Sequence, residues 1–310
     1  MPAISAKAPG KIILFGEHAV VYGRPAIAVP VEQVEAKAII IATPGKTSRI
    51  EAPGISLKCD LDELPPEHPL AMAVHLVQEK FGSNHIPAFQ MKIISTIPIA
   101  AGLGSGAAVS VAIIRALSAF AGSPMTDEQT SNLAFRVDQT YHSTPSGIDN
   151  TVISFAQPIL YIRGQPFERL SVGEPFTIVI GNTGISAPTS TVVTDLRRRW
   201  VEAPTIYETR FNRIGAIARE ARRLIEIGRP EEMGPLMNSN HDLLREINVS
   251  SPELDNLITA AIHAGALGAK MSGGGRGGNM IALARAERAD AVAQAIQQAG
   301  ATQTIVTQIN

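Results

Sequence analysis

The spacing of apolar residues along the first half of the chain predicts alternating strands and helices. Strands are predicted at 5–15, with an interruption at Pro9-Gly10, and at 26–41, 89–97 and 152–155. Helices are predicted at 69–81, 107–120 and 126–141, the last of them capped by Thr126. Because turn residues fill 157–173, we place a domain boundary there, which gives one domain at 1–174 and a second at 175–310.

The second half of the chain begins with a strand pattern at 176–181. Helices are predicted at 191–200, 204–228, 230–246, 252–263 and 287–299, and strands at 269–271, 280–284 and 302–309. This order contains two strand–helix–strand passages. It is compatible with a ferredoxin-like α+β sandwich.

A glycine-rich stretch, running from Ala101 to Ala107, connects the strand at 89–97 to the helix at 107–120. A loop of this kind presents free backbone N–H groups and the positive end of the helix dipole, which together favour phosphate. The absence of a following Lys-Ser or Lys-Thr pair excludes a Walker loop, and the spacing does not fit a dinucleotide fingerprint. The alternative is a purely structural connection to a buried helix.

Polar residues also gather near the N-terminus. Glu17 and His18 lie within a short segment bounded by Gly16 and Gly23, and Lys11 precedes Glu17 by six positions. These side chains could converge on one ligand. Each also has an ordinary explanation, as a surface lysine, a loop glutamate or a histidine satisfied within the fold.

A second glycine-rich loop lies near the C-terminus, where Gly273 to Gly278 contains five glycines in six positions. Glycine loses the most conformational entropy on folding and brings no side chain to pack. The loop therefore indicates a place where the backbone closely approaches a ligand.

Two carboxylates flank the turn at 143–147. Asp138 lies near the end of the predicted helix at 126–141, and Asp149 lies at the start of the predicted strand, eleven residues later. Carboxylates placed in this way can share a site, in which one ligates a cation and the other accepts a proton. The alternatives are a solvated helix charge for Asp138 and a turn or strand-start cap for Asp149.

Composition narrows the class of protein. The chain has 310 residues with 45% hydrophobic residues, which suits a folded protein with more than one core. A net charge of −1 gives no basic surface for nucleic acid. The single cysteine, Cys59, excludes an internal disulfide, and no apolar run is long enough to span a membrane. We therefore expect a cytoplasmic enzyme without nucleic-acid or membrane partners.

Three of these stretches together resemble the signature motifs of the GHMP small-molecule kinases in composition, order and spacing. They are Pro9 to Gly23, the Gly102-Leu103-Gly104-Ser105 loop, and Lys270 to Asn279. The Gly-Glu-His-Ala-Val-Val-Tyr-Gly sequence that begins at Gly16 resembles the members that phosphorylate mevalonate, as does Thr144 to Asn150. Galactokinases typically have a Gly-Glu-His-Thr-Asp variant, and homoserine kinases lack the Glu-His pair.

The resemblance implies an α+β fold with an N-terminal domain that contains a left-handed β-α-β unit and a ferredoxin-like C-terminal domain. It implies that ATP phosphorylates the primary hydroxyl of mevalonate, a step of isoprenoid precursor synthesis, in a cleft between the domains. Mg²⁺ is the implied cofactor, and a homodimer is compatible with the family.

The resemblance also implies a role for each matching residue. Asp149 would take the proton from the hydroxyl group, and Lys11 would support the developing charge. Glu17, His18 and Thr189 would bind mevalonate. The triphosphate would lie on Ala101, Gly102, Leu103, Gly104, Ser105, Gly106 and Ala107. The phosphoryl site would be shaped by Gly273, Gly274, Gly275 and Gly277.

Several residues depart from the family pattern. Gly106 stands where a magnesium-ligating serine is usual, and Asp138 stands where a glutamate is usual. The metal would then be held by Asp138 with additional water, or Ser105 would replace the missing hydroxyl, or the metal dependence would differ. Arg276 replaces a common glycine and would either add positive charge near the phosphates or project into solvent. Asn279 replaces a common cysteine.

Two alternatives remain open at this point. One is a different GHMP kinase, acting on phosphomevalonate or a sugar. The other is a relative that senses a ligand without turnover. The Glu17-His18 pair favours mevalonate, whereas retention of Lys11 and Asp149 favours catalysis.

Overall fold

The computed structural model describes residues 3–82, 85–98, 101–141, 145–186 and 188–310. Contacts between Cα atoms divide the chain into two compact units, each assembled from separate segments. Unit 1 comprises Met1–Gly10, Val34–Pro98 and Gly104–Ala156. Unit 2 comprises Lys11–Gln33, Ile99–Leu103 and Gln157–Asn310. The division falls inside the phosphate-loop stretch, between Leu103 and Gly104.

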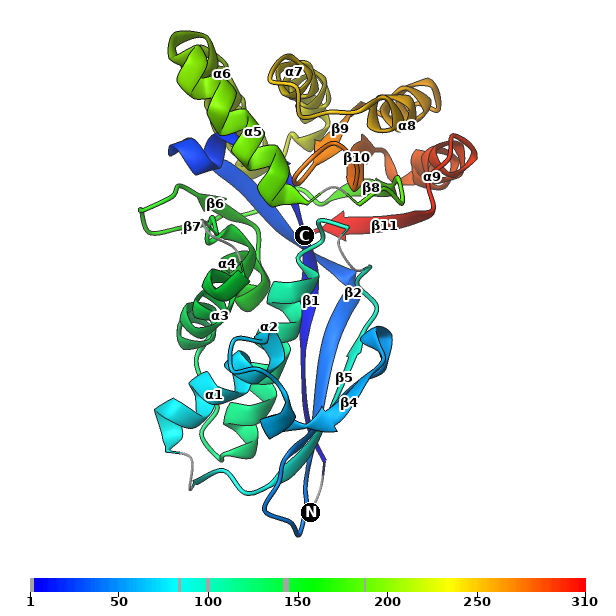
Figure 1. Cartoon of the computed structure of the whole chain (residues 1–310). Coiled ribbons are helices and arrows are strands. Elements are labelled where there is room, and N and C mark those ends of the chain that lie inside the picture. Colours follow the sequence, from blue (N-terminus) through cyan, green and yellow to red (C-terminus); the bar gives the residue numbers. More distant parts are fainter. Residues whose placement is uncertain (1–2, 83–84, 99–100, 142–144, 187) are drawn as a thin grey trace. The chain divides into compact units, whose positions relative to one another are not determined.

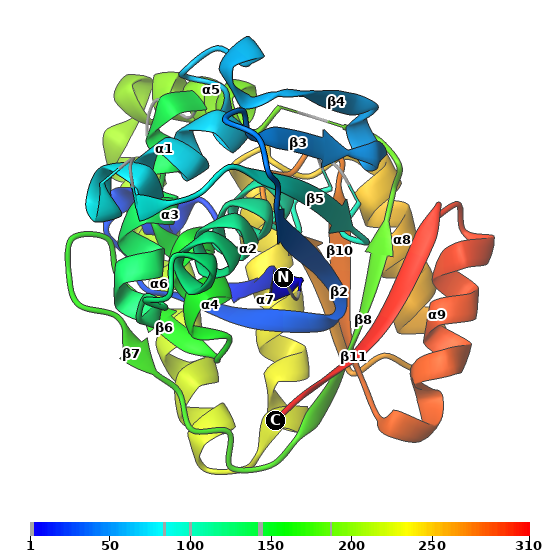
Figure 2. The same cartoon turned by 90° about the horizontal axis from the view of Figure 1, so that it is seen from below.

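Unit 1 consists of strands with helices on one side of them (Figures 1 and 2). The strands are β1 (Ile4–Phe15), β2 (Ala26–Ala42), β3 (Arg49–Ala52), β4 (Leu57–Asp60) and β5 (Phe89–Ser95). Their order is β4-β3-β5-β2, with β1 paired to β2; β3 and β5 are parallel, and β2 and β5 are antiparallel. The first part of β1 and the last part of β2 belong to this unit.

The helices of unit 1 bury their apolar faces. They are α1 (Pro69–Phe81), α2 (Ser105–Phe120), α3 (Asp127–Tyr141) and α4 (Ile148–Phe155). In β5, Phe89, Met91 and Ile93 alternate with exposed residues, as a strand with one buried face requires. The Thr126 hydroxyl accepts a bond from the Gln129 N–H at 3.2 Å, which confirms the predicted cap.

Two predictions in unit 1 are wrong. The strand β1 continues through Pro9-Gly10 without interruption; β1 pairs only with β2 among the described strands, and such an edge strand tolerates a proline. The predicted strand at 152–155 is part of the helix α4. Its β-branched residues favour a strand locally, but Ile148, Val152 and Ile153 are spaced to bury one helical face, and that packing decides the conformation.

Unit 2 contains the ferredoxin-like sheet (Figure 1). Its strands are β8 (Phe176–Asn182), β9 (Gly268–Ser272), β10 (Asn279–Ala284) and β11 (Gln303–Ile309), in the order β11-β8-β10-β9 with antiparallel neighbours. The short strands β6 (Ile159–Tyr161) and β7 (Glu168–Arg169) extend from the first residues of β2. The helices are α5 (Thr189–Glu202), α6 (Pro204–Glu226), α7 (Met233–Glu246), α8 (Pro252–His263) and α9 (Ala289–Gln298).

The strand order and the helical connections of this sheet confirm the predicted ferredoxin-like half. Helices α8 and α9 pack on one face of the sheet, where Val179, Met271 and Met280 join the buried core. Short 3-10 turns complete the chain: η1 (Ala19–Tyr22), η2 (Pro53–Ile55), η3 (Leu61–Glu63), η5 (Pro230–Glu232) and η6 (Ala286–Arg288). Among the described residues, no helix combines the length and apolar composition needed to cross a bilayer.

Candidate active site

The segment after β1 turns sharply at Gly16. Its φ of +95° belongs to the region that glycine adopts readily, and a Cβ there would lie 2.5 Å from the Pro25 carbonyl oxygen. Glu17 and His18 follow, and η1 continues the chain. The turn places both side chains inside unit 2, where Glu17 has no exposed surface and His18 is 6% exposed.

Glu17 forms a buried ion pair with Lys270 of β9, and neither side chain has any exposed surface. The ammonium group of Lys270 also donates to the Met271 carbonyl at 2.7 Å. Burial raises the pKa of Glu17 and lowers the pKa of Lys270, while each charge opposes the shift of the other. The pair joins the first and third motifs, which are 253 residues apart in the chain.

His18 is directed at the glycine-rich loop of the third motif, Gly273 to Gly278 (the third loop), because its Nε2 donates to the Gly274 carbonyl at 3.1 Å. Burial lowers the pKa of His18 to about 4, so the ring is neutral at pH 7. A neutral ring that donates from Nε2 keeps Nδ1 as an acceptor. His18 has a φ of +60°, which is unusual for a residue with a side chain. The Nε2 bond to the Gly274 carbonyl orients the ring.

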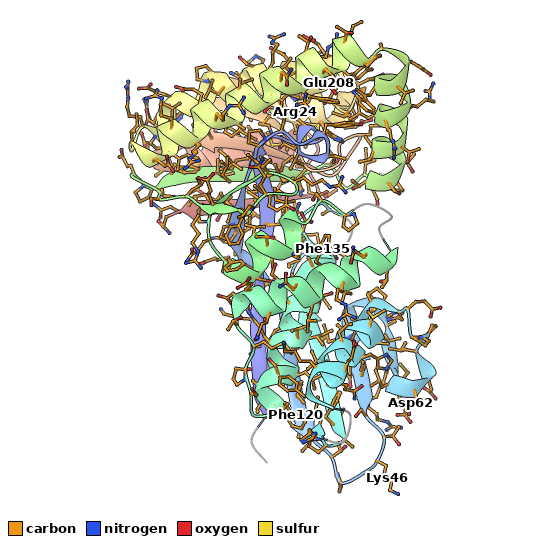
Figure 3. All side chains as sticks on the ribbon, turned by 90° about the vertical axis from the view of Figure 1, so that its left-hand side faces the viewer. Arg24, Lys46, Asp62, Phe120, Phe135 and Glu208 are labelled. Atoms are coloured by element: carbon orange, nitrogen blue, oxygen red, sulfur yellow. The ribbon has the colours of Figure 1, made fainter. Side chains whose placement is uncertain are left out.

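The segment that follows His18 is anchored to helix α6. Arg24 pairs with Glu208, and both side chains are labelled in Figure 3. Arg24 also donates to the Tyr22 carbonyl and to the Asn212 side chain. The ring of Tyr22 stacks on Phe211 with the centroids 4.2 Å apart. These contacts hold the end of the first motif against the helices of unit 2.

The third glycine-rich loop is shaped by close approach of other backbone. Gly275 has a φ of +79°, and a Cβ there would overlap the carbonyl oxygen of Val249. A Cβ on Gly277 would lie 2.5 Å from the Ile185 carbonyl oxygen, and one on Gly274 would lie 2.6 Å from the Thr189 hydroxyl. Both neighbours belong to unit 2, so the loop is confined from two sides.

Arg276 contacts helix α5 and the segment that precedes α8. Its guanidinium pairs with Asp195 of α5 and donates to the Asn248 carbonyl at 3.2 Å. The pKa of Asp195 is held below its usual range, chiefly by the hydrogen bond from Arg276. The side chain therefore fastens the third loop to α5.

The phosphate-loop stretch begins in unit 2. The Asn279 amide donates to the Ala101 carbonyl, and the Lys11 backbone N–H donates to the Leu103 carbonyl at 3.0 Å. A small cavity of about 20 Å³ is lined by Ala101, Gly102, Thr189, Ser272, Gly274, Gly275, Gly277 and Gly278. The structure thus brings Thr189, the start of the phosphate loop and the third loop to one place.

Lys11 lies beside the start of the phosphate-loop stretch, because its backbone N–H binds the Leu103 carbonyl. Its side chain is 4% exposed, and its charge contributes to lowering the pKa of Glu17, against the larger effect of burial. Two lysines, Lys11 and Lys270, therefore act on one buried carboxylate.

The remaining predicted site residues belong to unit 1. Gly104 has a φ of +74° and precedes α2, which begins at Ser105, so Ser105, Gly106 and Ala107 form its first turn. The free N–H groups of that turn point out of the helix end, as phosphate binding requires. Gly106 is exposed, whereas Ala107 is buried.

The carboxylates of unit 1 lie on neighbouring helices. Asp149 is half-buried in the first turn of α4, after Gly147 with a φ of +85°, and Asp138 of α3 is 6% exposed. The helices are tied together because the Asn150 amide donates to the Ser131 hydroxyl at 2.9 Å.

Sequence reasoning missed two residues of this site. Lys270 was considered only as part of a strand, and Asn279 only as a departure from a motif. The available signal for Lys270 was a charged residue between Ala269 and Met271 in a strand that otherwise lacks polar residues until Ser272. No local signal identifies the partner of either side chain, because both partners are distant in the chain.

Comparison with known proteins finds matches along the whole chain. The family model described as the GHMP kinases N terminal domain matches residues 68–157, and the GHMP kinases C terminal model matches residues 217–302. The mevalonate kinase of Thermococcus sibiricus is 38% identical over 326 residues, covering 99% of this chain and 96% of that protein. The mevalonate kinase of Thermococcus gammatolerans is 39% identical over 330 residues, with the same two coverages.

Solved structures agree with these matches. The crystal structure of L. major mevalonate kinase in complex with R-mevalonate is similar with a TM-score of 0.86 and 30% sequence identity. The similarity covers 99% of this chain and 95% of that one. Both glycine-rich loops and the first motif fall inside the matched length.

Proposed function

We propose that this chain, which belongs to the mevalonate kinases of the GHMP kinase family, uses ATP to phosphorylate the primary hydroxyl group of mevalonate. The observation that carries the proposal is the identity of 38% with a mevalonate kinase over 99% of the chain. The product would be 5-phosphomevalonate, with ADP as the second product. The enzyme would thereby serve isoprenoid precursor synthesis.

Asp149 would act as the base. The hydroxyl oxygen of mevalonate attacks the γ-phosphorus while its proton passes to the Asp149 carboxylate. The bond between the γ-phosphorus and the β–γ bridging oxygen breaks, and the electron pair leaves with ADP. Asp149 lies in the first turn of α4 and is half-buried, and this placement supports the role.

Lys11 and the glycine loops would stabilise the charge that develops during transfer. The first turn of α2 offers N–H groups to the ATP phosphates, and the Ala101–Leu103 part of the loop is fixed by backbone and amide bonds in unit 2. The Lys11 ammonium would lie near the transferred group. Phosphoryl transfer depends mostly on such positioning and charge neutralisation.

We propose that His18 and Thr189 contact mevalonate directly. The neutral His18 ring offers Nδ1 as an acceptor, which suits a substrate hydroxyl group. Glu17 is also expected to take part in substrate binding. Since its carboxylate has no exposed surface and pairs with Lys270, we propose that Glu17 acts by holding the His18 segment in place.

Asp138 and Ser105 would hold Mg²⁺. Carboxylate and hydroxyl oxygens are the donors that Mg²⁺ prefers, and it usually keeps several waters while binding one or two carboxylates and substrate phosphates. The donor set of unit 1 therefore fits the ion although Gly106 supplies no hydroxyl. When bound, Mg²⁺ neutralises phosphate charge.

We further propose that residues 1–174 and 175–310 form the two domains of the family fold. The two family models support this boundary because they match on either side of it, at 68–157 and 217–302. A cytoplasmic location and a homodimer stay predictions.

A coupled ADP-release assay with ATP and Mg²⁺ tests the proposed function. Mevalonate, phosphomevalonate, galactose and homoserine are compared at equal concentrations. We expect ADP release with mevalonate alone. Release with phosphomevalonate or galactose instead would assign a different GHMP kinase activity, and ATP binding without release would indicate a ligand sensor.

A further inference from the structure

One face of the ferredoxin-like sheet carries polar side chains where a core would normally be apolar. Residues on strands alternate between faces, and Met271 and Met280 point to the face covered by helices α8 and α9. Their neighbours Ser272 and Asn279 therefore point to the opposite face. Cross-strand register places Ser272, Asn279 and Asn182 in one row at the end of the sheet.

The members of this row each bind a different segment. The Ser272 hydroxyl accepts from the Ile13 N–H at 3.2 Å and donates to the Ile13 carbonyl at 2.9 Å. The Asn182 side chain accepts from the Gly184 N–H at 2.6 Å. Asn279 reaches the phosphate-loop stretch, where its amide donates to the Ala101 carbonyl.

Asn279 is buried, with 2% of its surface exposed, and its Oδ1 has no hydrogen-bond partner among the described residues. An unpaired buried carbonyl oxygen is unfavourable for folding. Only the amide end can donate to the Ala101 carbonyl, so the orientation of the side chain is determined by that bond. The hydrogen bond to the Ala101 carbonyl is therefore the contact that Asn279 contributes. The unpaired Oδ1 lowers the stability of the fold.

Besides the bond from Asn279, the contacted backbone is held at Leu103, whose carbonyl accepts from the Lys11 N–H at 3.0 Å. Gly102 and Gly104 have φ values of +77° and +74°, and the adjoining glycines lower the stiffness of the stretch. A Cβ on Gly102 would lie 3.9 Å from the Asn279 amide nitrogen, and one on Gly278 would lie 3.6 Å from the Ala101 carbonyl. The start of the phosphate loop thus lies against the third loop, and the Asn279 amide joins them.

We propose that Asn279 is a positioning residue for nucleotide binding, which holds the Ala101 carbonyl and thereby fixes Ala101, Gly102 and Leu103 against the third glycine-rich loop. The proposal rests on the proposed function, since it takes this stretch as part of the ATP phosphate site.

The test compares Asn279→Leu and Asn279→Ala with the wild-type protein. Leucine keeps a similar size and removes both polar ends, including the unpaired Oδ1, so we expect this variant to stay folded. Asn182→Ala is the matched control, because Asn182 is the cross-strand neighbour of Asn279 and its side chain bonds to Gly184 instead of the phosphate loop. Thermal unfolding is recorded for every variant.

The dissociation constant of MgATP is measured by calorimetry without mevalonate, so the readout does not depend on which substrate is phosphorylated. We expect it to rise about three- to tenfold in both Asn279 variants, as the loss of one positioning hydrogen bond predicts, and to stay unchanged in Asn182→Ala. In the coupled assay, the KM for the phosphoryl acceptor should change less than twofold.

An unchanged MgATP dissociation constant in folded Asn279→Leu would overturn the proposal. An equal weakening in Asn182→Ala would also overturn it, because the effect would then belong to the sheet end as a whole. If Asn279→Ala loses its fold, Asn279→Leu decides the question. Failure of mevalonate phosphorylation by the wild-type protein would instead contradict the proposed function and leave the MgATP measurement valid.

Discussion

Lys270→Met removes the ammonium group from the buried pair with Glu17. We expect the variant to lose about 3–5 kcal/mol of unfolding free energy, the loss found when one partner of a buried ion pair is removed. Neither side chain has exposed surface, so no solvent screening reduces this figure. The loss arises because the Glu17 carboxylate remains buried next to a thioether that cannot donate a hydrogen bond.

The pH dependence of the loss identifies its cause. Burial already raises the pKa of Glu17, and without Lys270 the largest opposing charge is gone. A carboxyl group whose pKa is raised in the folded state stabilises the folded protein fully below the unfolded-state pKa. That stability is lost as the pH rises through the folded-state pKa. The loss in Lys270→Met should therefore be smaller near pH 4.5 than at pH 8.

Urea unfolding followed by circular dichroism measures these free energies. The double variant Glu17→Met/Lys270→Met replaces the pair by apolar groups and should recover most of the loss, since such replacements are often neutral. Arg285→Met is the control, because it breaks an exposed ion pair with Glu231 and should have a far smaller effect. Two results would contradict a buried, unpaired Glu17 charge as the cause. One is a loss of unfolding free energy in Lys270→Met that does not change with pH. The other is a double variant whose loss equals the sum of the losses in the two single variants.

Three further predictions follow from the site. Asp149→Asn should lower kcat by about 10²–10⁴-fold, as expected for loss of a general base, and leave MgATP affinity unchanged; stopped-flow ADP release and calorimetry measure the two, and an active variant would remove Asp149 as the base. Gly275→Ala should lower the melting temperature and abolish activity, because the new Cβ would overlap the Val249 carbonyl and the φ of +79° disfavours it; a wild-type melting curve would contradict this. His18 should stay neutral from pH 5 to 8, and since its pKa is lowered to about 4, its contribution to stability is present above the unfolded pKa of about 6.5 and falls from there towards pH 4; NMR titration of the ring would contradict this if the midpoint lay near 6.5.

The elements with a strong local pattern were predictable from the sequence. The helix α1 matches its predicted range, and the helix after the phosphate loop begins two residues earlier than predicted, at Ser105. The two strand–helix–strand passages of the second half are compatible with a ferredoxin-like sandwich, but the strand order β11-β8-β10-β9 came from the structure. In contrast, the segment 148–155 has a β-branched composition that local propensity assigns to a strand, and only its packing in unit 1 makes it helical.

The residue types of the candidate site were visible in the sequence, but the contacts between them were not. Glycine content drew attention to both loops. The Glu17–Lys270 pair and the Asn279–Ala101 bond join residues 253 and 178 positions apart, and no periodicity records such contacts. The partner of Arg276 could not be predicted either, because Asp195 lies on helix α5, 81 positions away in the chain.

The position of the new phosphate on mevalonate is the most direct test of the account. The purified protein is incubated with mevalonate, ATP and Mg²⁺, and the product is examined by phosphorus NMR with coupling to protons retained. We predict a phosphomonoester signal split by the protons of one CH₂ group, which identifies the primary oxygen. A phosphomonoester without that splitting would place the phosphate on the tertiary hydroxyl, and the absence of any new phosphomonoester signal would mean that the chain does not phosphorylate mevalonate. Either result would contradict the proposed reaction.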